Sequence, residues 1–327
     1  MIVVEGVSKY YGRNPAVRDL TFTIDEGECI GFLGLNGAGK STTLRMLSCL
    51  LLPTAGSIRV GGFDVESDPH EIRKLIGYLP DSPPLYPEMR VDEFLRFAGR
   101  LRRMSKKQVE ARLPVVIEKT GLADYAEAPI ETLSHGYRQR VGIAQAMIHE
   151  PKLLILDEPI QGLDPVQIIE MRELIRSLRG EHTILLSSHI LSEIERTCDR
   201  VLMLNEGRIV ASGTEQEIIV QLEARPATYR DAAAQSAMLI AFEVRGDEAA
   251  VRAALSSTDV TIVDLSRREG GICRVKARST EDARELIAKR VVEAGLGLLA
   301  LQRTRTALEE VFVRMNEDGA PPEGPQA

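Results

Sequence analysis

The sequence predicts an α/β fold built on a mixed, mainly parallel sheet, followed by a second and smaller α+β domain. Through the first part of the chain, short apolar strands alternate with helical segments, which is the order of parallel βαβ units. A glycine-rich loop lies directly between one of these strands and the helix that follows it. The last part has the order strand, helix, strand, strand, helix, strand, which is the split βαβ order.

The first domain also contains two stretches of a different kind. Near its start, residues 2–4 and 20–24 resemble short β-strands, and Gly61 and Gly62 mark a tight turn between two more strands. After about residue 91, apolar residues recur at helical spacing with charged faces between them. We therefore predict an antiparallel β subdomain and a helical subdomain inserted over about residues 91–150.

A change of composition marks the domain boundary. An Ala-rich stretch that contains Pro226 indicates a linker, and Thr306 with Glu309 forms a capping box that predicts a last helix at 307–315. The predicted organisation is a first domain at 1–222, a linker at 223–233, a ferredoxin-like second domain at 234–315 and a disordered tail at 316–327.

The composition argues against several classes of protein. A formal net charge of −7 disfavours a general affinity for nucleic acid, which needs clustered Lys and Arg. The four cysteines lack the short spacing of a metal site, so we expect reduced thiols packed as small hydrophobes (Cys29, Cys49, Cys198, Cys273). No apolar run approaches the roughly 18 residues of a membrane span, and no signal peptide is visible, so we expect a cytoplasmic chain.

The glycine-rich loop is the strongest motif. Residues 34–41 read GLNGAGKS, which fits G-x-x-x-x-G-K-[ST] between the apolar strand 29–33 and the apolar helical run 42–51. Backbone N–H groups of such a loop point at phosphate oxygens, Lys40 would contact the β- and γ-phosphates, and Ser41 would ligate Mg²⁺. The residues predicted to bind ATP here are Asn36, Gly37, Ala38, Gly39, Lys40, Ser41 and Thr42.

Two carboxylates follow a buried strand at 153–156. Asp157 is predicted to hold Mg²⁺, and Glu158 to act as the general base for the attacking water. His189 ends another apolar strand, 183–188, where it could orient that water. The structural alternatives are an acidic turn for the carboxylates and a hydrogen-bonded structural group for His189.

A family resemblance enters with residues 133–140, Leu-Ser-His-Gly-Tyr-Arg-Gln-Arg, which resemble the signature motif of ABC ATPases. A capped surface helix is the alternative explanation of this segment. The resemblance implies that Ser134 and Gly136 meet the γ-phosphate held by an opposite subunit. It also implies that Tyr11, or alternatively Tyr10, stacks on adenine. Residues 162–165 resemble the D-loop, which includes Asp164.

The chain departs from the family pattern in three places. Asp81 stands where the Q-loop at 76–81 usually has Gln, which leaves its contact with Mg²⁺ open. His135 and Tyr137 alter the signature motif, and Ile160 replaces a usual Thr or Ser before the D-loop. None of these changes removes a group assigned above to phosphate binding or to water activation, so we expect an active ATPase.

The resemblance implies an ATP-binding, ATP-hydrolysing subunit that powers a separate multi-span permease. The segment 308–312, Leu-Glu-Glu-Val-Phe, resembles ATPases of ABC-2-type exporters, with the gliding-motility branch the most similar. A second ATP-binding subunit, in a head-to-tail homodimer, is expected, as is a position on the inner face of the cell membrane. Residues 83–94 are the expected coupling surface.

The alternative function is a soluble ABC ATPase that acts on ribosomes or DNA without transport. Translation-type members usually carry two ATP domains in one chain, and this chain has one set of motifs. Sustained heptads are absent, and the acidic net charge disfavours nucleic acid as a partner. The sequence therefore favours transport.

Overall fold

The computed structural model describes residues 1–214, 217–218, 221, 238–256, 258, 260–268, 271–279 and 282–305 of the 327-residue chain. The chain divides into two compact units, Met1–Thr214 and Glu215–Ala327. The predicted linker at 223–233, the last helix at 307–315 and the tail at 316–327 lie outside the described residues.

The first unit contains a four-stranded antiparallel sheet in the order β2-β1-β4-β5. Its strands are β1 (Ile2–Tyr11), β2 (Asn14–Ile24), β4 (Ala55–Val60) and β5 (Phe63–Asp64). Gly61 and Gly62 form the turn between β4 and β5, with φ angles of 60° and 85° that favour glycine. This sheet is the predicted antiparallel subdomain.

The second sheet has six strands in the order β10-β9-β3-β8-β7-β6. They are β3 (Cys29–Leu33), β6 (Ile76–Leu79), β7 (Leu153–Asp157), β8 (Thr183–Ser188), β9 (Arg200–Asn205) and β10 (Arg208–Gly213). All pairs are parallel except β9 with β10, so the sheet is mixed as predicted. The strands β3, β7 and β8 are buried along their whole length, which explains their continuous apolar runs.

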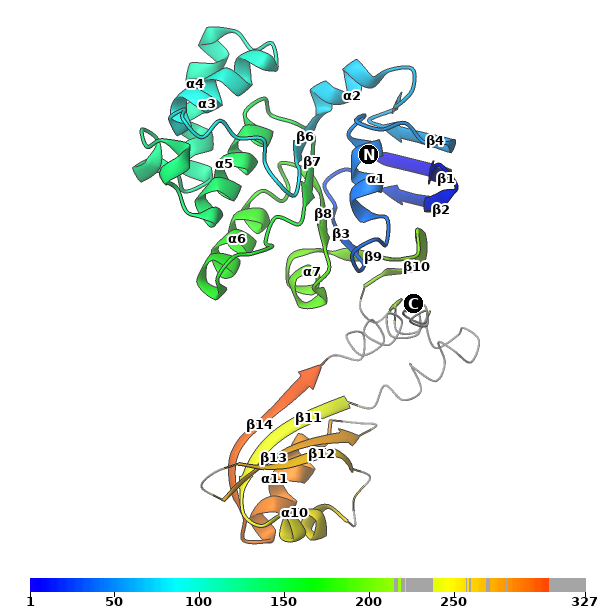
Figure 1. The fold of residues 1–327 in the computed structure, drawn as a ribbon, viewed down its shortest axis with the longest axis vertical. Helices are drawn as coiled ribbons and strands as arrows, with labels where there is room; N and C mark the ends of the chain where they lie inside the picture. Colours follow the sequence, from blue (N-terminus) through cyan, green and yellow to red (C-terminus); the bar gives the residue numbers. More distant parts are fainter. Residues whose placement is uncertain are drawn as a thin grey trace, which may run out of the picture. The chain divides into compact units, whose positions relative to one another are not determined.

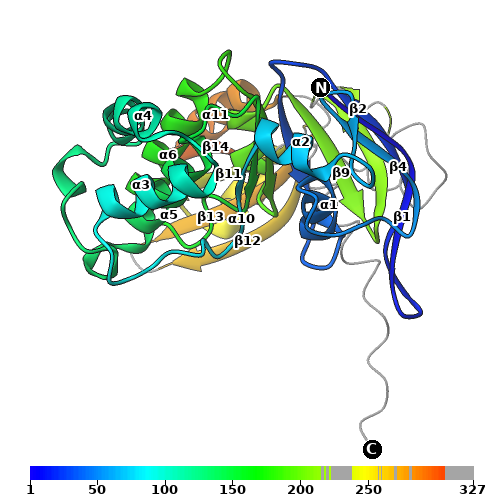
Figure 2. The same cartoon turned by 90° about the horizontal axis from the view of Figure 1, so that it is seen from above.

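Helices surround this sheet. They are α1 (Lys40–Leu47), α2 (Pro69–Leu75), α3 (Val91–Leu101), α4 (Lys106–Lys119), α5 (His135–Met147), α6 (Pro165–Ser177) and α7 (Leu191–Thr197), with short 3-10 turns at Ala123–Tyr125 and Ile130–Thr132. Figures 1 and 2 show α3, α4 and α5 on one side of the parallel strands and the antiparallel sheet on the other. The short helix α2 was not predicted from the sequence.

The second unit has the predicted order of elements. The elements are β11 (Met238–Arg245), α10 (Glu248–Leu255), β12 (Thr261–Arg268), β13 (Ile272–Ser279), α11 (Arg284–Glu293) and β14 (Gly297–Arg305). The strands form an antiparallel sheet in the order β12-β13-β11-β14. Buried residues of the sheet and both helices form one apolar core, including Phe242, Val251 and Ile287.

No helix in the described part of the chain combines the length and the apolar character that crossing a membrane requires.

Candidate active site

The glycine-rich loop connects β3 to α1 at the carboxyl edge of the parallel strands. Gly39 caps α1 with φ 100°, a conformation that side-chain-bearing residues rarely adopt. A Cβ atom at Gly39 would lie 2.6 Å from the carbonyl oxygen of Ala16, so the position also lacks the space for a side chain. Asn36 and Gly37 are exposed at the tip of the loop. The backbone can therefore approach a ligand closely, as phosphate binding requires.

Lys40 lies buried at the first position of α1, with its ammonium group folded back into the loop. Its Nζ donates hydrogen bonds to the carbonyl oxygens of Gly34 at 2.6 Å and Leu35 at 3.3 Å. The same Nζ lies 3.1 Å from Oε1 of Glu158 as an ion pair. The structure therefore joins the predicted phosphate-binding lysine directly to the predicted general base.

Asp157 ends β7 and accepts two hydroxyl hydrogen bonds at its Oδ1. Ser41 donates at 3.1 Å and Ser187 donates at 2.7 Å. Burial raises the pKa of Asp157, and these two hydrogen bonds act in the opposite direction. A hydroxyl and a carboxylate are hard oxygen ligands, and a magnesium ion bound with a nucleotide takes few ligands from the protein. The pair Ser41 and Asp157 therefore fits Mg²⁺, although the described residues contain no cluster of three His, Cys, Asp or Glu side chains that could hold a metal alone.

Glu158 follows Asp157 in a left-handed backbone conformation, with φ 49°. Its backbone N–H donates to Oγ of Ser187 at 2.9 Å, and its Oε2 lies 3.0 Å from Nδ1 of His189. Left-handed backbone at a residue other than glycine is uncommon and is found at functional sites that the surrounding structure holds in place. The fold thus brings Lys40, Glu158 and His189 into one connected group.

Serines at the end of β8 complete this group, and the sequence analysis did not single them out. Ser187 pairs in register with Asp157 across the parallel strands, and its hydroxyl donates to Oδ1 of Asp157 and accepts from the backbone N–H of Glu158. Ser188 donates to Oε2 of Glu193 at 2.8 Å and accepts from the N–H of Ile190 at 3.0 Å. Burial raises the pKa of Glu193. The sequence signal for these hydrogen bonds was the pair of adjacent serines, Ser187 and Ser188, at the end of an apolar strand.

The segment that resembles the signature motif starts α5. Ser134 caps the helix by accepting a hydrogen bond from the N–H of Tyr137 at 3.4 Å. Nε2 of His135 lies 3.1 Å from the carbonyl oxygen of Gln161, so α5 is joined to the loop that precedes α6. A Cβ atom at Gly136 would lie 2.6 Å from Oε1 of Gln167, the far end of a flexible side chain that can move aside, so space alone does not require glycine there.

The remaining predicted residues form contacts elsewhere. Asp164 caps α6, where its Oδ1 accepts from the N–H groups of Val166 at 3.0 Å and Gln167 at 2.9 Å. Tyr11 ends β1 and is exposed, as is Tyr10. Asp81 is exposed beyond β6, and its charge contributes, after burial, to the raised pKa of Asp157. Among the described residues, none of these forms a hydrogen bond or ion pair with Lys40 or Glu158, so a nucleotide would have to connect them.

Two of the cysteines come together although they are distant in sequence. Sγ of Cys29 lies 3.8 Å from Sγ of Cys198, and Cys29 and Cys49 are buried. The four cysteines are free thiols, as predicted.

A phosphate-binding loop that opens a helix, with paired carboxylates on a neighbouring parallel strand, defines a nucleoside triphosphatase domain. A family model described as ABC transporter matches residues 17–161. The uncharacterized ABC transporter ATP-binding protein YxlF of Bacillus subtilis (strain 168) is 42% identical over 218 residues, which cover 67% of this chain and 72% of that protein. The chain therefore belongs to the ABC transporter family, and it is an ATP-binding, ATP-hydrolysing subunit of that family.

Two relatives match over almost the whole chain. The bacitracin transport ATP-binding protein BcrA of Bacillus licheniformis is 34% identical over 317 residues, which cover 96% of this chain and 97% of that protein. The linearmycin resistance ATP-binding protein LnrL of Bacillus subtilis (strain 168) is 31% identical over 320 residues, with 96% and 98% covered. A solved ATP-binding subunit of an ABC transporter has a TM-score of 0.62 at 36% identity, covering 69% of this chain and 95% of that one.

Proposed function

We propose that the chain hydrolyses ATP at the carboxyl edge of β3, β7 and β8, and that this hydrolysis drives export through a separate ABC-2-type permease. The observation that carries the proposal is the connected group formed by Lys40, Asp157, Glu158 and His189, in which the Ser187 hydroxyl joins the Asp157 carboxylate to the backbone N–H of Glu158. These are the groups that bind phosphate, hold a metal ion and activate water in one place.

Glu158 is the general base in this proposal. Its Oε2 is held by His189, which fixes the carboxylate and orients the water that attacks the γ-phosphate. Lys40 leaves Oε1 of Glu158 and contacts the β- and γ-phosphates when ATP enters. Release of Glu158 from this ion pair makes its carboxylate available to accept the proton of the water.

Ser41 and Asp157 are the residues that would hold Mg²⁺. When bound, the ion supplies positive charge that neutralises the phosphate oxygens. Asp81 is the remaining candidate ligand for Mg²⁺. Its side chain is exposed to solvent.

A second copy of the chain completes the site. The N-terminal end of α5, with Ser134 and Gly136, carries partial positive charge that suits a γ-phosphate held by the partner. Asp164 lies in the loop that would face the same partner, and Tyr11 supplies an exposed aromatic ring for adenine. A homodimer is the simplest assembly for a chain with one complete motif set.

Two relatives that match across nearly the whole chain support export, because their names refer to bacitracin transport and linearmycin resistance. We place the chain on the inner face of the cell membrane, bound to its permease. The ABC-2-type group and its gliding-motility branch stay predictions from the sequence resemblance.

The test combines two measurements on the full chain. Purified protein should hydrolyse ATP in the presence of Mg²⁺, and tagged Glu158→Gln protein held with ATP should retain a multi-span protein from detergent-solubilised native membranes. Mass spectrometry identifies what is retained. Recovery of ribosomal or DNA-bound proteins in place of a membrane protein would contradict transport and favour the non-transport alternative.

A further inference from the structure

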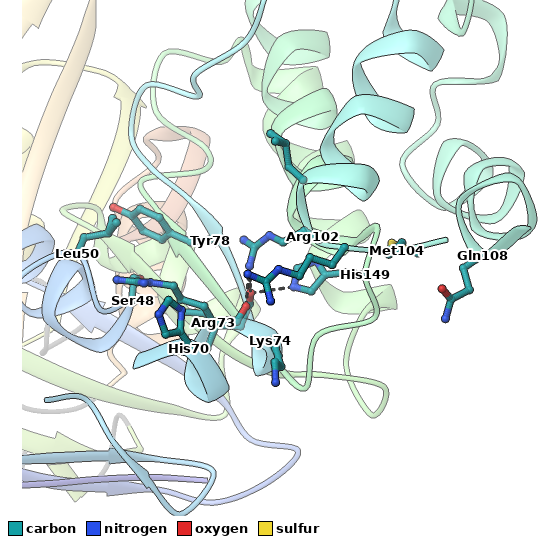
Figure 3. A pocket seen from close by; sticks show the side chains of 13 residues that line it. Ser48, Leu50, His70, Arg73, Lys74, Tyr78, Arg102, Met104, Gln108 and His149 are labelled. Atoms are coloured by element: carbon teal, nitrogen blue, oxygen red, sulfur yellow. Dashed lines mark hydrogen bonds between the residues drawn. The ribbon is translucent and has the colours of Figure 1, made fainter. Parts of the chain in front are cut away.

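A basic cleft lies between α2 and the end of α3, away from the glycine-rich loop. Its volume is about 590 Å³, and Figure 3 shows the side chains that line it, among them Arg73, Arg102 and His149. Arg102 donates to the carbonyl oxygen of Arg73 at 2.6 Å, and Nε2 of His149 lies 2.9 Å from the carbonyl oxygen of Ile76. The described residues that line the cleft include no Asp or Glu and no residue assigned to ATP binding or hydrolysis.

A second polar group, the pair Ser188 and Glu193, lies next to His189 and in contact with the active site. Ser188 is the last residue of β8 and is 2% exposed, and Glu193 lies in the first turn of α7 and is 5% exposed. Buried polar side chains are stable only with hydrogen-bond partners, because they have lost their contacts with water. The partners that this pair takes therefore show which parts of the chain it holds in place.

The Ser188 hydroxyl holds the turn that carries His189. It accepts a hydrogen bond from the N–H of Ile190 at 3.0 Å, so the side chain of Ser188 bridges the backbone on either side of His189. The N–H of Glu193 donates to the carbonyl oxygen of Ile190 at 3.3 Å, which ties the same turn to α7. His189 thus presents Nδ1 to Oε2 of Glu158, at 3.0 Å, from a backbone that is held on both sides.

Glu193 fixes the direction of the hydroxyl proton of Ser188. The Ser188 hydroxyl donates to Oε2 of Glu193 at 2.8 Å. A carboxylate only accepts hydrogen bonds, so the hydroxyl proton is directed to Glu193 and the hydroxyl oxygen is left to accept from Ile190. Burial raises the pKa of Glu193, and the hydrogen bond from Ser188 and the charge of Arg172 act in the opposite direction. Glu193 therefore selects one hydrogen-bond pattern for the turn.

The carbonyl group of Ser188 extends these contacts to the glycine-rich loop. It accepts from the N–H of Gly34, the first residue of that loop, at 3.4 Å. This contact follows from the register of β3 and β8, in which Leu33 lies opposite Ser188. Ser188 therefore contacts the phosphate-binding loop through its backbone and the His189 turn through its side chain. A substitution of the side chain should disturb the turn and keep the contact with Gly34.

We propose that Ser188 and Glu193 are positioning residues for ATP hydrolysis, which hold His189 where it contacts Glu158 and orients the attacking water. This rests on the proposed function for the roles of Glu158 and His189. Ser188 and Glu193 act through His189, and their side chains make no contact with the phosphates. Their loss should therefore lower the turnover number and leave KM for ATP almost unchanged.

The first experiment measures steady-state ATP hydrolysis by the full chain with Mg²⁺. Ser188→Ala should lower the turnover number about tenfold and change KM less than about twofold, and Ser188→Thr should recover most of the turnover because it keeps the hydroxyl. Glu193→Ala should have the same effect as Ser188→Ala. Glu193→Gln should retain most of the turnover, because its amide oxygen can accept from Ser188. Ser192→Ala, at a half-buried serine of α7, is the matched control and should have no effect.

A double-mutant cycle with His189→Ala separates positioning of His189 from a general structural role. If Ser188 acts through His189, Ser188→Ala should lower turnover less than about twofold once His189 is already alanine. A tenfold loss in both backgrounds would overturn the proposal, as would unchanged turnover in Ser188→Ala or a rise in KM as large as the fall in turnover. Thermal unfolding shows whether each variant is folded. Ser188→Cys keeps the side-chain volume and weakens both hydrogen bonds, so it provides the same test if Ser188→Ala does not fold.

A second measurement does not depend on turnover. The chain has five histidines, and ¹³C labelling of their rings gives NMR signals, of which that of His189 is identified by its loss in His189→Ala. Ser188→Ala should shift this signal, and Ser192→Ala should not. An unmoved His189 signal overturns the proposal and leaves the proposed function intact. A wild-type chain that does not hydrolyse ATP overturns the proposed function, while the NMR signal still decides whether Ser188 positions His189.

Discussion

Charged side chains are paired with each other in the active site, whereas Arg73 and Arg102 of the basic cleft form no ion pair within the part of the chain that the structure describes. In the active site, Lys40 forms an ion pair with Glu158, so a positive and a negative group of the same chain are paired, and His189 contacts the same carboxylate. In the cleft, Arg73 and Arg102 lie together without a carboxylate. The comparison teaches that ATP has to replace an internal partner of Lys40, whereas the cleft offers charges that only another molecule can neutralise.

The largest expected effect comes from a substitution in the active site, where the charges are paired. Glu158→Gln removes the general base and the negative charge that holds Lys40, and it keeps an amide oxygen within reach of His189. The turnover number for ATP should fall by about 10²- to 10⁴-fold. ATP should also bind more tightly, because Lys40 no longer has to leave an ion pair. Steady-state hydrolysis and equilibrium binding of a fluorescent ATP analogue measure both quantities.

Glu173→Gln is the matched control, because Glu173 is exposed on α6. It should leave turnover and ATP affinity unchanged. If Glu158→Gln hydrolysed ATP at the wild-type rate, Glu158 would not be the base. If it lost turnover without any gain in affinity, the pair of Lys40 with Glu158 would not compete with ATP.

The second prediction concerns the Ser187 hydroxyl, which links the Asp157 carboxylate to the backbone of Glu158. Ser187→Ala leaves the N–H of Glu158 and Oδ1 of Asp157 each without one partner, at a cost of about 1–3 kcal/mol for a buried group. We expect turnover to fall about tenfold, and Ser187→Thr to retain most of it because the hydroxyl is kept. Ser177→Ala on α6 is the control. Equal turnover in Ser187→Ala and wild type would contradict a positioning role for Ser187.

The third prediction concerns the pH dependence of stability that His149, a residue lining the cleft, confers. The pKa of His149 is about 4 in the fold, against an ordinary value near 6.5, so the unfolded chain takes up a proton first as the pH falls. Stability from the neutral ring is therefore complete above about pH 6.5 and is lost as the pH falls toward 4. Between pH 7 and pH 5 this loss should reach about 1–2 kcal/mol.

Urea unfolding at the two pH values measures that loss. His149→Gln removes the titrating ring and keeps an amide that can donate to the carbonyl of Ile76, so its stability should change less between the same pH values. An equal loss in wild type and variant would mean that other groups cause the pH dependence. The neighbours whose charges also act on His149 are Arg102 and His182.

The active site was easier to predict from the sequence than the cleft. Lys40, Asp157 and Glu158 stand in short contiguous motifs whose neighbours are a strand and a helix, and parallel strands bring such motifs to one edge. Ser187 was missed because its importance depends on the register between β7 and β8. The cleft could not be predicted, because Arg73 lies on α2 and Arg102 directly after α3, which are separate in sequence, and α2 itself was not expected.

The smallest expected effect tests a contact between subdomains. His135→Gly removes the 3.1 Å contact of Nε2 with the carbonyl of Gln161. A net hydrogen bond is worth about 0.5–1.5 kcal/mol, so turnover should fall by about twofold to at most about tenfold, with a smaller change in KM for ATP. Lys106→Gly is the matched control, because Lys106 is also exposed at the first position of a helix, α4. If both glycine variants lose turnover equally, general loosening of a helix start is the cause; a loss confined to His135→Gly shows that the link from α5 to the loop before α6 positions the site.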